Sequence, residues 1–172
     1  MTALDPGDRI DPTRWRAAVE RAYDEGFTYL DLLTAIDHLA DPGEPGIDVL
    51  VRVLHLWDRP AVGARVIRTR VADGAVLESL TPVFAGAAWA ERELHEMFGI
   101  GFSGFQDGTD LGLRRLLLPA AFEGTPLRKS FVLAARAARP WPGAVEPGGR
   151  EPAVGRRRAR PHGIPDEPWG AW

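Results

Sequence analysis

Two β-rich runs, residues 47–57 and 62–71, constrain the fold of this chain more than any other feature. The first run alternates apolar side chains on both of its faces: Val49, Val51 and Val53 on one, and Leu50, Leu54 and Leu56 on the other. A strand that is apolar on both faces is typical of a central, covered position. The second run is interrupted by Arg65, Arg68 and Arg70, and a turn at residues 58–60 separates the two. The pattern predicts an antiparallel pair whose first strand is covered on both sides.

The segments before this pair give weaker signals. Residues 1–10 are expected to be a loose start, and Asp11-Pro12 then predicts a helix with an acidic N-cap and Pro in its first turn. Helical spacing of the apolar residues continues to a stop at Gly26. Residues 27–37 predict a short strand that leads into a turn of helix. Pro and Gly at residues 41–46 predict a loop, and Asp73-Gly74 predicts a tight turn.

A helix after Thr81-Pro82 has the clearest periodicity, and the same dipeptide is expected to supply its cap and first-turn Pro. Five apolar residues, spaced four, three, four and three apart, predict one narrow buried stripe: Val83, Ala87, Ala90, Leu94 and Met97. Gly99 predicts the end of this helix. The sequence therefore predicts an α+β fold, a small and mainly antiparallel sheet packed by helices, over residues 1–134.

Residues 135–172 differ from the rest in composition, because Pro, Gly and Arg dominate and apolar periodicity is absent. We expect an extended, partner-binding tail that is mobile in the isolated chain and ordered only against partners. Seven Arg and four acids give residues 132–172 a charge of +3, which leaves −6 for residues 1–131 of a chain with net charge −3. This balance argues against nucleic-acid binding, although the tail contains the run Arg156-Arg157-Arg158.

The chain contains no Cys, which excludes disulfides, thiolate metal sites and Cys-ligated iron–sulfur clusters within it. No run approaches the roughly 20 apolar residues that a transmembrane helix needs. Glu91 and His95 are one turn apart and could both reach a metal ion, but no third ligand has suitable spacing. The glycines Gly99, Gly101, Gly104 and Gly108 follow a helix instead of a strand, so we interpret them as a winding loop and not as a dinucleotide fingerprint.

Glu91, Arg92 and Glu93 lie on the predicted helix, with both carboxylates expected at the edges of its apolar stripe. Buried carboxylates need partners, so we expect an ion-pair network with Arg114, Arg115, Arg128 and Lys129. The alternative is that Glu91 and Glu93 are paired carboxylates for acid–base catalysis. The sequence favours the structural interpretation, because no nucleophile or metal-binding set accompanies them.

The stretch from Trp89 to Phe131 resembles the thirty-kilodalton subunit of respiratory complex I, which is the C subunit of the bacterial NADH:quinone oxidoreductase. The resemblance covers roughly residues 27–133. The matching residues are Trp89, Glu91, Arg92, Glu93, Phe98, Gly99, Ile100, Phe102, Gly104, Arg114, Arg115, Gly124, Pro126, Leu127, Arg128 and Lys129. Departures from the family pattern include Phe105-Gln106, Thr125, Ser130, Glu96 in place of an Asp, and an insertion near residues 108–112. They indicate a divergent member.

The resemblance implies a non-catalytic subunit of a proton-translocating translocase, attached at the cytoplasmic face of the bacterial membrane only through its partners. These partners would be the quinone-site subunit, which the chain braces, and cluster-bearing subunits. NADH, flavin, iron–sulfur clusters and quinone would all be held by partner subunits, with no cofactor here. The structural and partner-interface residues would be Glu91, Arg92, Glu93, Arg114, Arg115, Pro126, Leu127, Arg128 and Lys129. Alternatives are the equivalent subunit of a membrane-bound nickel–iron hydrogenase or ferredoxin-fed dehydrogenase, and a free-standing carboxylate-dependent hydrolase.

Overall fold

A computed structural model describes residues 8–57 and 62–132 of the chain. A four-stranded sheet has the order β1-β4-β3-β2, formed by β1 (Asp8–Ile10), β4 (Gly63–Val71), β3 (Ile47–His55) and β2 (Tyr29–Asp37). The three long strands pair antiparallel, and β1 pairs parallel with β4. The predicted α+β fold with a mainly antiparallel sheet is confirmed. The tail at 135–172, with its predicted mobility, lies outside the described residues.

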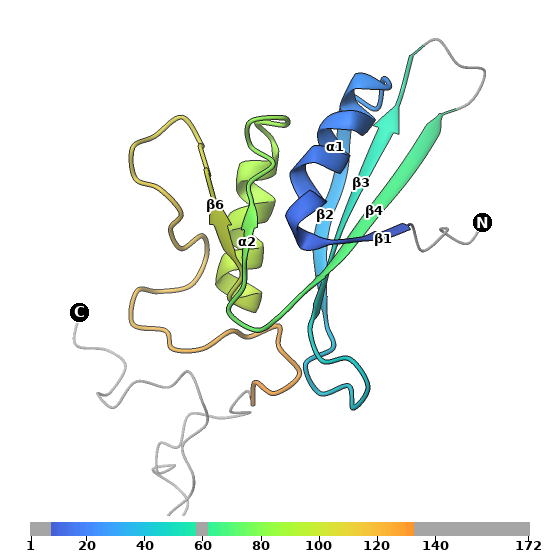
Figure 1. Ribbon diagram of the computed structural model, residues 1–172. Coiled ribbons are helices and arrows are strands. Elements are labelled where there is room, and N and C mark those ends of the chain that lie inside the picture. Colours follow the sequence, from blue (N-terminus) through green and yellow to red (C-terminus); the bar gives the residue numbers. More distant parts are fainter. Residues whose placement is uncertain (1–7, 58–61, 133–172) are drawn as a thin grey trace, which may run out of the picture.

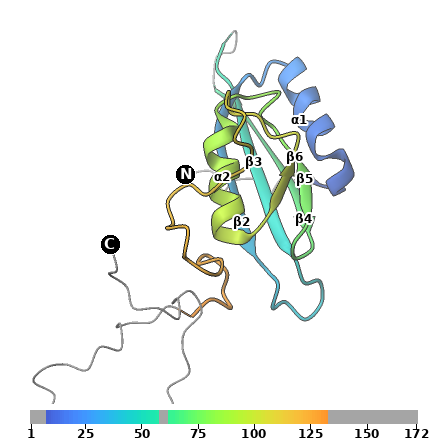
Figure 2. The ribbon, with the colours of Figure 1, turned by 90° about the vertical axis from the view of Figure 1, so that its left-hand side faces the viewer.

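The helices and a second, smaller sheet all lie on one face of the large sheet (Figures 1 and 2). A short 3-10 turn, η1 (Pro12–Arg14), leads into α1 (Trp15–Asp24), and α2 (Ala87–Phe98) lies between the parallel strands β5 (Val76–Glu78) and β6 (Gly101–Ser103) in the sequence. The predicted N-cap at Asp11 is confirmed, because its carboxylate accepts a hydrogen bond from the backbone N–H of Thr13.

The hydrophobic core fills the space between the large sheet and the two helices. Alternate residues of β2, β3 and β4 point into it, and Trp15 and Val19 of α1 meet them from the other side. The buried apolar residues of these strands are Leu33, Ala35, Ile47, Val49, Val51, Val53, Ile67 and Val71. Complete burial of this much apolar surface is what holds the helices against the sheet.

The opposite face of the large sheet is uncovered by any described element (Figure 1). β3 is central, as predicted, but it is covered on one side only: Val49, Val51 and Val53 are buried, whereas Leu50 and Leu54 of the other face stay partly exposed. The prediction of a strand covered on both sides was therefore wrong. Apolar residues on one face of a strand do not indicate whether the same chain covers that face.

Three further predictions concern the edges and turns of the sheet. Residues 8–10 form β1 instead of belonging to a loose start, because β1 adds a parallel strand to the edge of β4. Residues 29–37 are strand throughout, with a bulge between Leu30 and Leu32 and no turn of helix. The turn at Asp73-Gly74 is confirmed by φ +68° at Gly74, and it leads out of the large sheet into β5.

The start of α2 also differs from the prediction. Thr81-Pro82 forms a separate turn, closed by bonds from the backbone N–H groups of Val83 and Phe84 to the carbonyl of Leu80. The helix begins at Ala87, and its N-cap Gly86 makes no side-chain cap. Gly99, with φ +76°, ends the helix as predicted. Gly104 and Gly108 also have positive φ, but Gly101 lies in β6 and is not part of the winding loop.

A candidate partner-binding strap on helix α2

Helix α2 turns a different stripe toward the core from the one predicted. The buried residues of this helix are Ala87, Glu91, Leu94, Glu96 and Phe98. Ala87, Glu91, Leu94 and Phe98 follow helical spacing, so the buried face is rotated away from Val83, Ala90 and Met97, which are only partly buried. Glu91 therefore belongs to the buried face of the helix and has no solvent exposure. Apolar periodicity could not locate this face because one of its members is an acid.

The Glu91 carboxylate is bound by neutral donors instead of a cation. It has no solvent exposure, and it accepts hydrogen bonds from Ser79 Oγ at 2.6 Å and from the backbone N–H of Leu80 at 2.5 Å. Burial raises its pKa to about 7, although both hydrogen bonds act in the opposite direction. The predicted pairing of Glu91 with Arg or Lys is thus not present among the described residues.

Glu93 also lacks the predicted partner. It lies on a half-buried part of α2 and forms no ion pair with the described residues. Arg114, one of its expected partners, instead contacts Asp107 at 2.5 Å. Hydrogen bonds from the side chain of Thr109, from Arg114 and from the backbone of Thr109 lower the pKa of Asp107 to about 2. Asp107 and Arg114 lie on either side of the insertion near residues 108–112, so their ion pair holds the two ends of this loop together.

Residues 104–132 form a long strap of turns and bends without a helix or strand, and it runs over α2 and under the sheets (Figures 1 and 2). We call this segment the strap. Arg92 of α2 donates from its guanidinium to the carbonyl oxygens of Arg114 and Arg115, at 3.3 and 2.5 Å. The second of these, Arg115, in turn donates to the Pro119 carbonyl at 2.9 Å. Arg92 and Arg115 therefore bind backbone carbonyl groups at this point of the motif.

Glu96 makes the densest attachment between α2 and the strap. Its carboxylate accepts hydrogen bonds from three consecutive backbone N–H groups, those of Leu116, Leu117 and Leu118, at 2.8–3.1 Å. Burial raises the pKa of Glu96, but the three hydrogen bonds and the nearby Arg115 guanidinium outweigh it and leave that pKa below its ordinary value. In the sequence, Glu96 stands out only as a mild departure from the family pattern. Its position one turn beyond Arg92 on the same helix was the signal that could have identified it.

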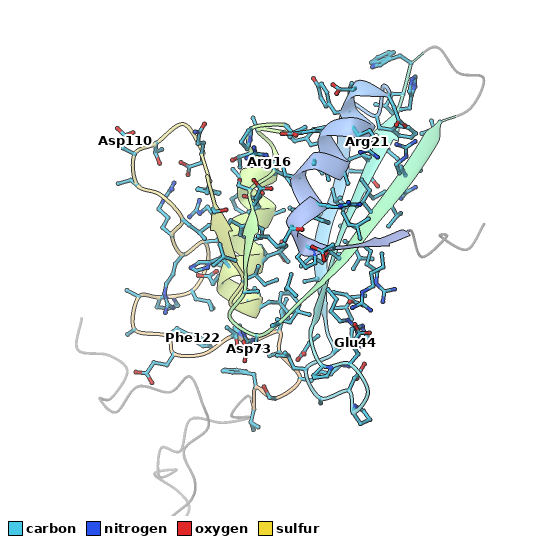
Figure 3. All side chains as sticks on the ribbon, in the orientation of Figure 1. Arg16, Arg21, Glu44, Asp73, Asp110 and Phe122 are labelled. Atoms are coloured by element: carbon cyan, nitrogen blue, oxygen red, sulfur yellow. The ribbon has the colours of Figure 1, made fainter. Side chains whose placement is uncertain are left out.

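The end of the strap is fixed at the C-terminal end of α2. The backbone N–H of Leu127 donates to the Met97 carbonyl at 3.2 Å, and Arg128 Nε donates to the Phe98 carbonyl at 2.8 Å. The Arg128 guanidinium also pairs with Asp73 at 2.6 Å, in the turn that Figure 3 shows beside the strap. These bonds satisfy carbonyl groups that a helix end leaves open.

Lys129 contributes through its backbone. Its N–H donates to Asp37 Oδ2 at 2.7 Å, while Asp37 Oδ1 accepts from the N–H of Leu39. Asp37 is buried at the end of β2, so this contact ties the strap to the large sheet. Its role was not predicted, because the partners are separated by 92 positions in the sequence. Pro126 is half-buried, and Leu127 is 51% exposed.

Several apolar side chains of the strap project away from its attachments. Leu111 is 71% exposed, Leu117 65%, Leu127 51% and Val132 60%. Single exposed apolar residues are ordinary, whereas contiguous apolar patches mark interaction surfaces. The strap is thus fastened through its backbone while these side chains stay free for contacts outside the described chain.

The described residues contain no group of three or more His, Asp or Glu that could hold a metal ion. The ring of His95, one turn from Glu91 on α2, contacts the Ile100 carbonyl at 3.0 Å. No helix in the described ranges is long and apolar enough to cross a membrane.

Comparison with known protein families covers both the sheets and the strap. Residues 9–137 match the family described as respiratory-chain NADH dehydrogenase, 30 Kd subunit. The chain belongs to this family. The match runs from β1 to beyond the strap. The resemblance inferred from residues 89–131 is confirmed.

Named relatives within this family are subunits of the same class of enzyme. The chain is 46% identical over 80 residues to the C subunit of the NADH-quinone oxidoreductase of Agrobacterium fabrum, covering 46% of this chain and 37% of the relative. It is 48% identical over 67 residues to subunit 9 of the NADH-ubiquinone oxidoreductase of Prototheca wickerhamii, covering 39% and 32%. The matched region thus spans only about a third of the length of these two relatives.

Solved structures agree with the architecture of this family. A trypsin-resistant fragment of Nqo5 is similar with a TM-score of 0.51 and 25% identity, covering 58% of this chain and 79% of the fragment. A chain of an archaeal membrane-bound sulfane sulfur reductase is similar in fold, with a TM-score of 0.50 and 20% identity, covering 60% and 59%. The family's α+β fold is therefore shared by respiratory membrane complexes with different chemistry.

Proposed function

We propose that this chain is a cofactor-free structural subunit of the peripheral arm of a proton-translocating NADH:quinone oxidoreductase, where it braces the quinone-site subunit and contacts cluster-bearing subunits. It would lie at the cytoplasmic face of the membrane and reach the membrane only through these partners. The observation that carries the proposal is the strap, which is ordered by its own chain yet exposes a series of apolar side chains in a member of this family.

Several charged residues of the family motif support a structural role because they bind backbone groups that order the strap. Arg92 and Arg128 bind backbone carbonyl groups, and Glu96 binds three backbone N–H groups. A catalytic acid or base must reach a substrate proton, within hydrogen-bond distance or through one water. Glu91 has no solvent exposure, which weighs against the alternative of a free-standing hydrolase that uses Glu91 and Glu93.

The exposed side chains of the strap support partner contact. Leu117 projects from the same three residues whose N–H groups Glu96 holds, so its position is fixed before any partner binds. Preorganisation of this kind lowers the entropic cost of association. The surrounding motif residues Pro126, Leu127 and Lys129 would belong to the same interface.

The proposal is tested by isolating the full chain, carrying an affinity tag, from solubilised membranes of its own organism. We expect quinone-site and cluster-bearing subunits to co-purify, together with a flavin-containing NADH-oxidising subunit. If a hydrogenase large subunit co-purified and the flavin subunit did not, the chain would instead be the equivalent subunit of a membrane-bound hydrogenase. Recovery of the chain alone, with hydrolytic activity, would overturn the structural role.

Matched variants test the strap itself. Leu117→Asp places a charge on the strap, and Val76→Asp places one on the equally exposed β5, where Val76 is 65% exposed. We expect Leu117→Asp to reduce incorporation into the complex and Val76→Asp to leave it unchanged, with normal turnover in each complex that assembles. Equal incorporation of both variants would exclude the strap as the interface.

A further inference from the structure

A small polar cluster is buried against α2, and it is different from the strap contacts of Arg92, Glu96 and Arg128. Glu91 and Ser79 are 0% exposed, and Thr81 is 7% exposed. Ser79 Oγ lies 2.6 Å from Glu91 Oε2 and 2.7 Å from Thr81 Oγ1, so two hydroxyl groups stand in line between the carboxylate and the surface. Thr81 Oγ1 also accepts the backbone N–H of Gln106, which fixes the outer end of this line.

No charged group acts on Glu91 from the elements around it. Burial and the hydrogen bonds from Ser79 and Leu80 set its pKa, and no charge contributes. The ionisable side chains of neighbouring elements have other partners: Glu78 of β5 pairs with Arg16 of α1, Asp37 of β2 binds the N–H groups of Leu39 and Lys129, Asp107 of the strap pairs with Arg114, and His95 of α2 contacts the Ile100 carbonyl. The pKa of the Glu91 carboxyl group is therefore set by burial and by these two hydrogen bonds, without a neighbouring charge.

The hydrogen bonds of this cluster can run in either direction. With Glu91 ionised, Ser79 donates to the carboxylate and Thr81 donates to Ser79. With Glu91 neutral, its O–H donates to Ser79, and Ser79 donates to Thr81. Either atom of the Ser79–Thr81 pair can be the donor, so no heavy atom needs to move.

Reversal of the line transfers one proton without leaving a charge on either hydroxyl. The Ser79 hydroxyl proton passes to Glu91 Oε2, the Thr81 hydroxyl proton passes to Ser79 Oγ, and a proton from solvent binds Thr81 Oγ1. Each hydroxyl gives up one proton and gains one, and the net change is one proton on Glu91. Thr81, where the solvent proton enters, is the one member of the line with any solvent exposure.

We infer that Glu91, Ser79 and Thr81 form an internal proton-binding site, filled and emptied through the two hydroxyl groups while the fold stays closed. The inference goes beyond the proposed function and does not depend on it. It assigns Glu91 as the group that holds the proton and Thr81 as the entry point. Ser79 connects the two.

The test follows the carboxyl carbon of Glu91 by NMR in the full chain, labelled at glutamate, between pH 5 and pH 9. We expect one glutamate signal to titrate with a midpoint near pH 7 and to be absent in Glu91→Gln. Ser79→Ala removes a donor to the ionised form, so it should raise that midpoint and identify the signal even if Glu91→Gln does not fold. Midpoints near the ordinary glutamate value in every variant would overturn the site.

The route is tested by the rate of proton exchange after a pH jump. Thr81→Val keeps the Ser79–Glu91 contact but removes the entry hydroxyl, so we expect slower protonation. The matched control is Ser103→Ala, which removes a hydroxyl bound to the Leu77 carbonyl outside the line and should leave the rate unchanged. An unchanged rate in Thr81→Val would overturn the route, and loss of amide protection across α2 at the same pH would overturn the closed fold.

Discussion

The body of the molecule, residues 8–103, and the strap, residues 104–132, are ordered by different forces. In the body, alternate strand residues and one face of each helix bury an apolar core. The strap is held by individual hydrogen bonds from its backbone to side chains of α2 and β2. Glu96 accepts three of its N–H groups, and Asp37 accepts the N–H of Lys129. The core is cooperative because each side chain packs against many others, whereas the attachments of the strap are separate contacts. We therefore expect mutations to unfold the body globally and to release the strap locally.

The largest expected effect is a cavity in the body. Leu94 is 2% exposed and belongs to the hydrophobic core that α2 shares with the large sheet. Leu94→Ala should lower the free energy of unfolding by about 2–5 kcal/mol, from lost burial and the cavity left behind. Chemical denaturation of the full chain, followed by circular dichroism, measures it. A loss below about 1 kcal/mol would show that α2 is attached mainly by the polar contacts and would erase the distinction between the two regions.

The difference between the regions explains which parts of the structure the sequence could predict. Strand alternation located β3 and β4 because burial repeats every second residue. The same reasoning failed for α2, since the acid Glu91 is part of its buried face, and for the outer face of β3, since apolar residues there need no cover from this chain. No periodic sequence pattern predicts the contacts of the strap. Its contacts join single residues that are distant in sequence, such as Asp37 and Lys129.

The resemblance to a family located the motif residues but not their partners. Arg92, Arg114 and Arg128 belong to the site, yet each binds a group different from the one that charge matching predicted. Charge matching considers only side chains, whereas Arg92 and Arg128 use their guanidinium groups on backbone carbonyls. The carboxylate of Glu96 similarly satisfies backbone N–H groups. Backbone groups are identical at every position, so a sequence does not mark them as partners.

The second expected effect is opposite pH dependence in the two regions. The pKa of Glu91 is raised from the unfolded value of 4.5 to about 7. Its contribution to the free energy of unfolding is therefore complete below pH 4.5 and is lost as pH rises through about 7. The loss is on the order of 3 kcal/mol. The pKa of Glu96 is lowered, so its contribution is present above 4.5 and is lost as pH falls through its folded value.

Denaturation as a function of pH measures the effect of Glu91 on global stability. Amide exchange at Leu116–Leu118 measures the effect of Glu96 on the strap. Global stability should fall from pH 4.5 to pH 8 in the wild type and stay nearly level in Glu91→Gln. Protection of the three strap amides should fall on acidification, in a range where the core amides stay protected. The same direction of change in both regions would contradict the assignment.

A smaller effect is expected from Glu96→Gln. The variant keeps the shape of the side chain but replaces a charged acceptor of three hydrogen bonds by a neutral amide, at a cost of about 1–3 kcal/mol. The loss should appear as faster exchange at Leu116, Leu117 and Leu118, with little change in exchange within β3. Glu93→Gln, on the same helix but without an ion pair to the described residues, is the matched control. Equal effects of the two variants would mean that charge on α2, and not the contacts of Glu96, orders the strap.

The smallest expected effects come from two acids that each hold an arginine near the surface. Asp31 pairs with Arg52 on the open face of the large sheet at 3.1 Å, and Asp107 pairs with Arg114 in the strap at 2.5 Å. Ion pairs near the surface contribute little to stability, so Asp31→Asn should not change the unfolding midpoint measurably, and Asp107→Asn, whose pair with Arg114 is part-buried in a loop, should change it only slightly. They should still differ in amide exchange. Asp31 is the unpaired residue of the β2 bulge, but Leu30 and Leu32 on either side pair with β3 regardless of the ion pair, so exchange at these neighbours should not change. Around Asp107, the side chain also accepts from Thr109, and the described loop has no strand or helix to replace these contacts, so residues 107–114 should exchange a few-fold faster. A faster exchange at both sites would show that the sheet, too, depends on individual polar contacts.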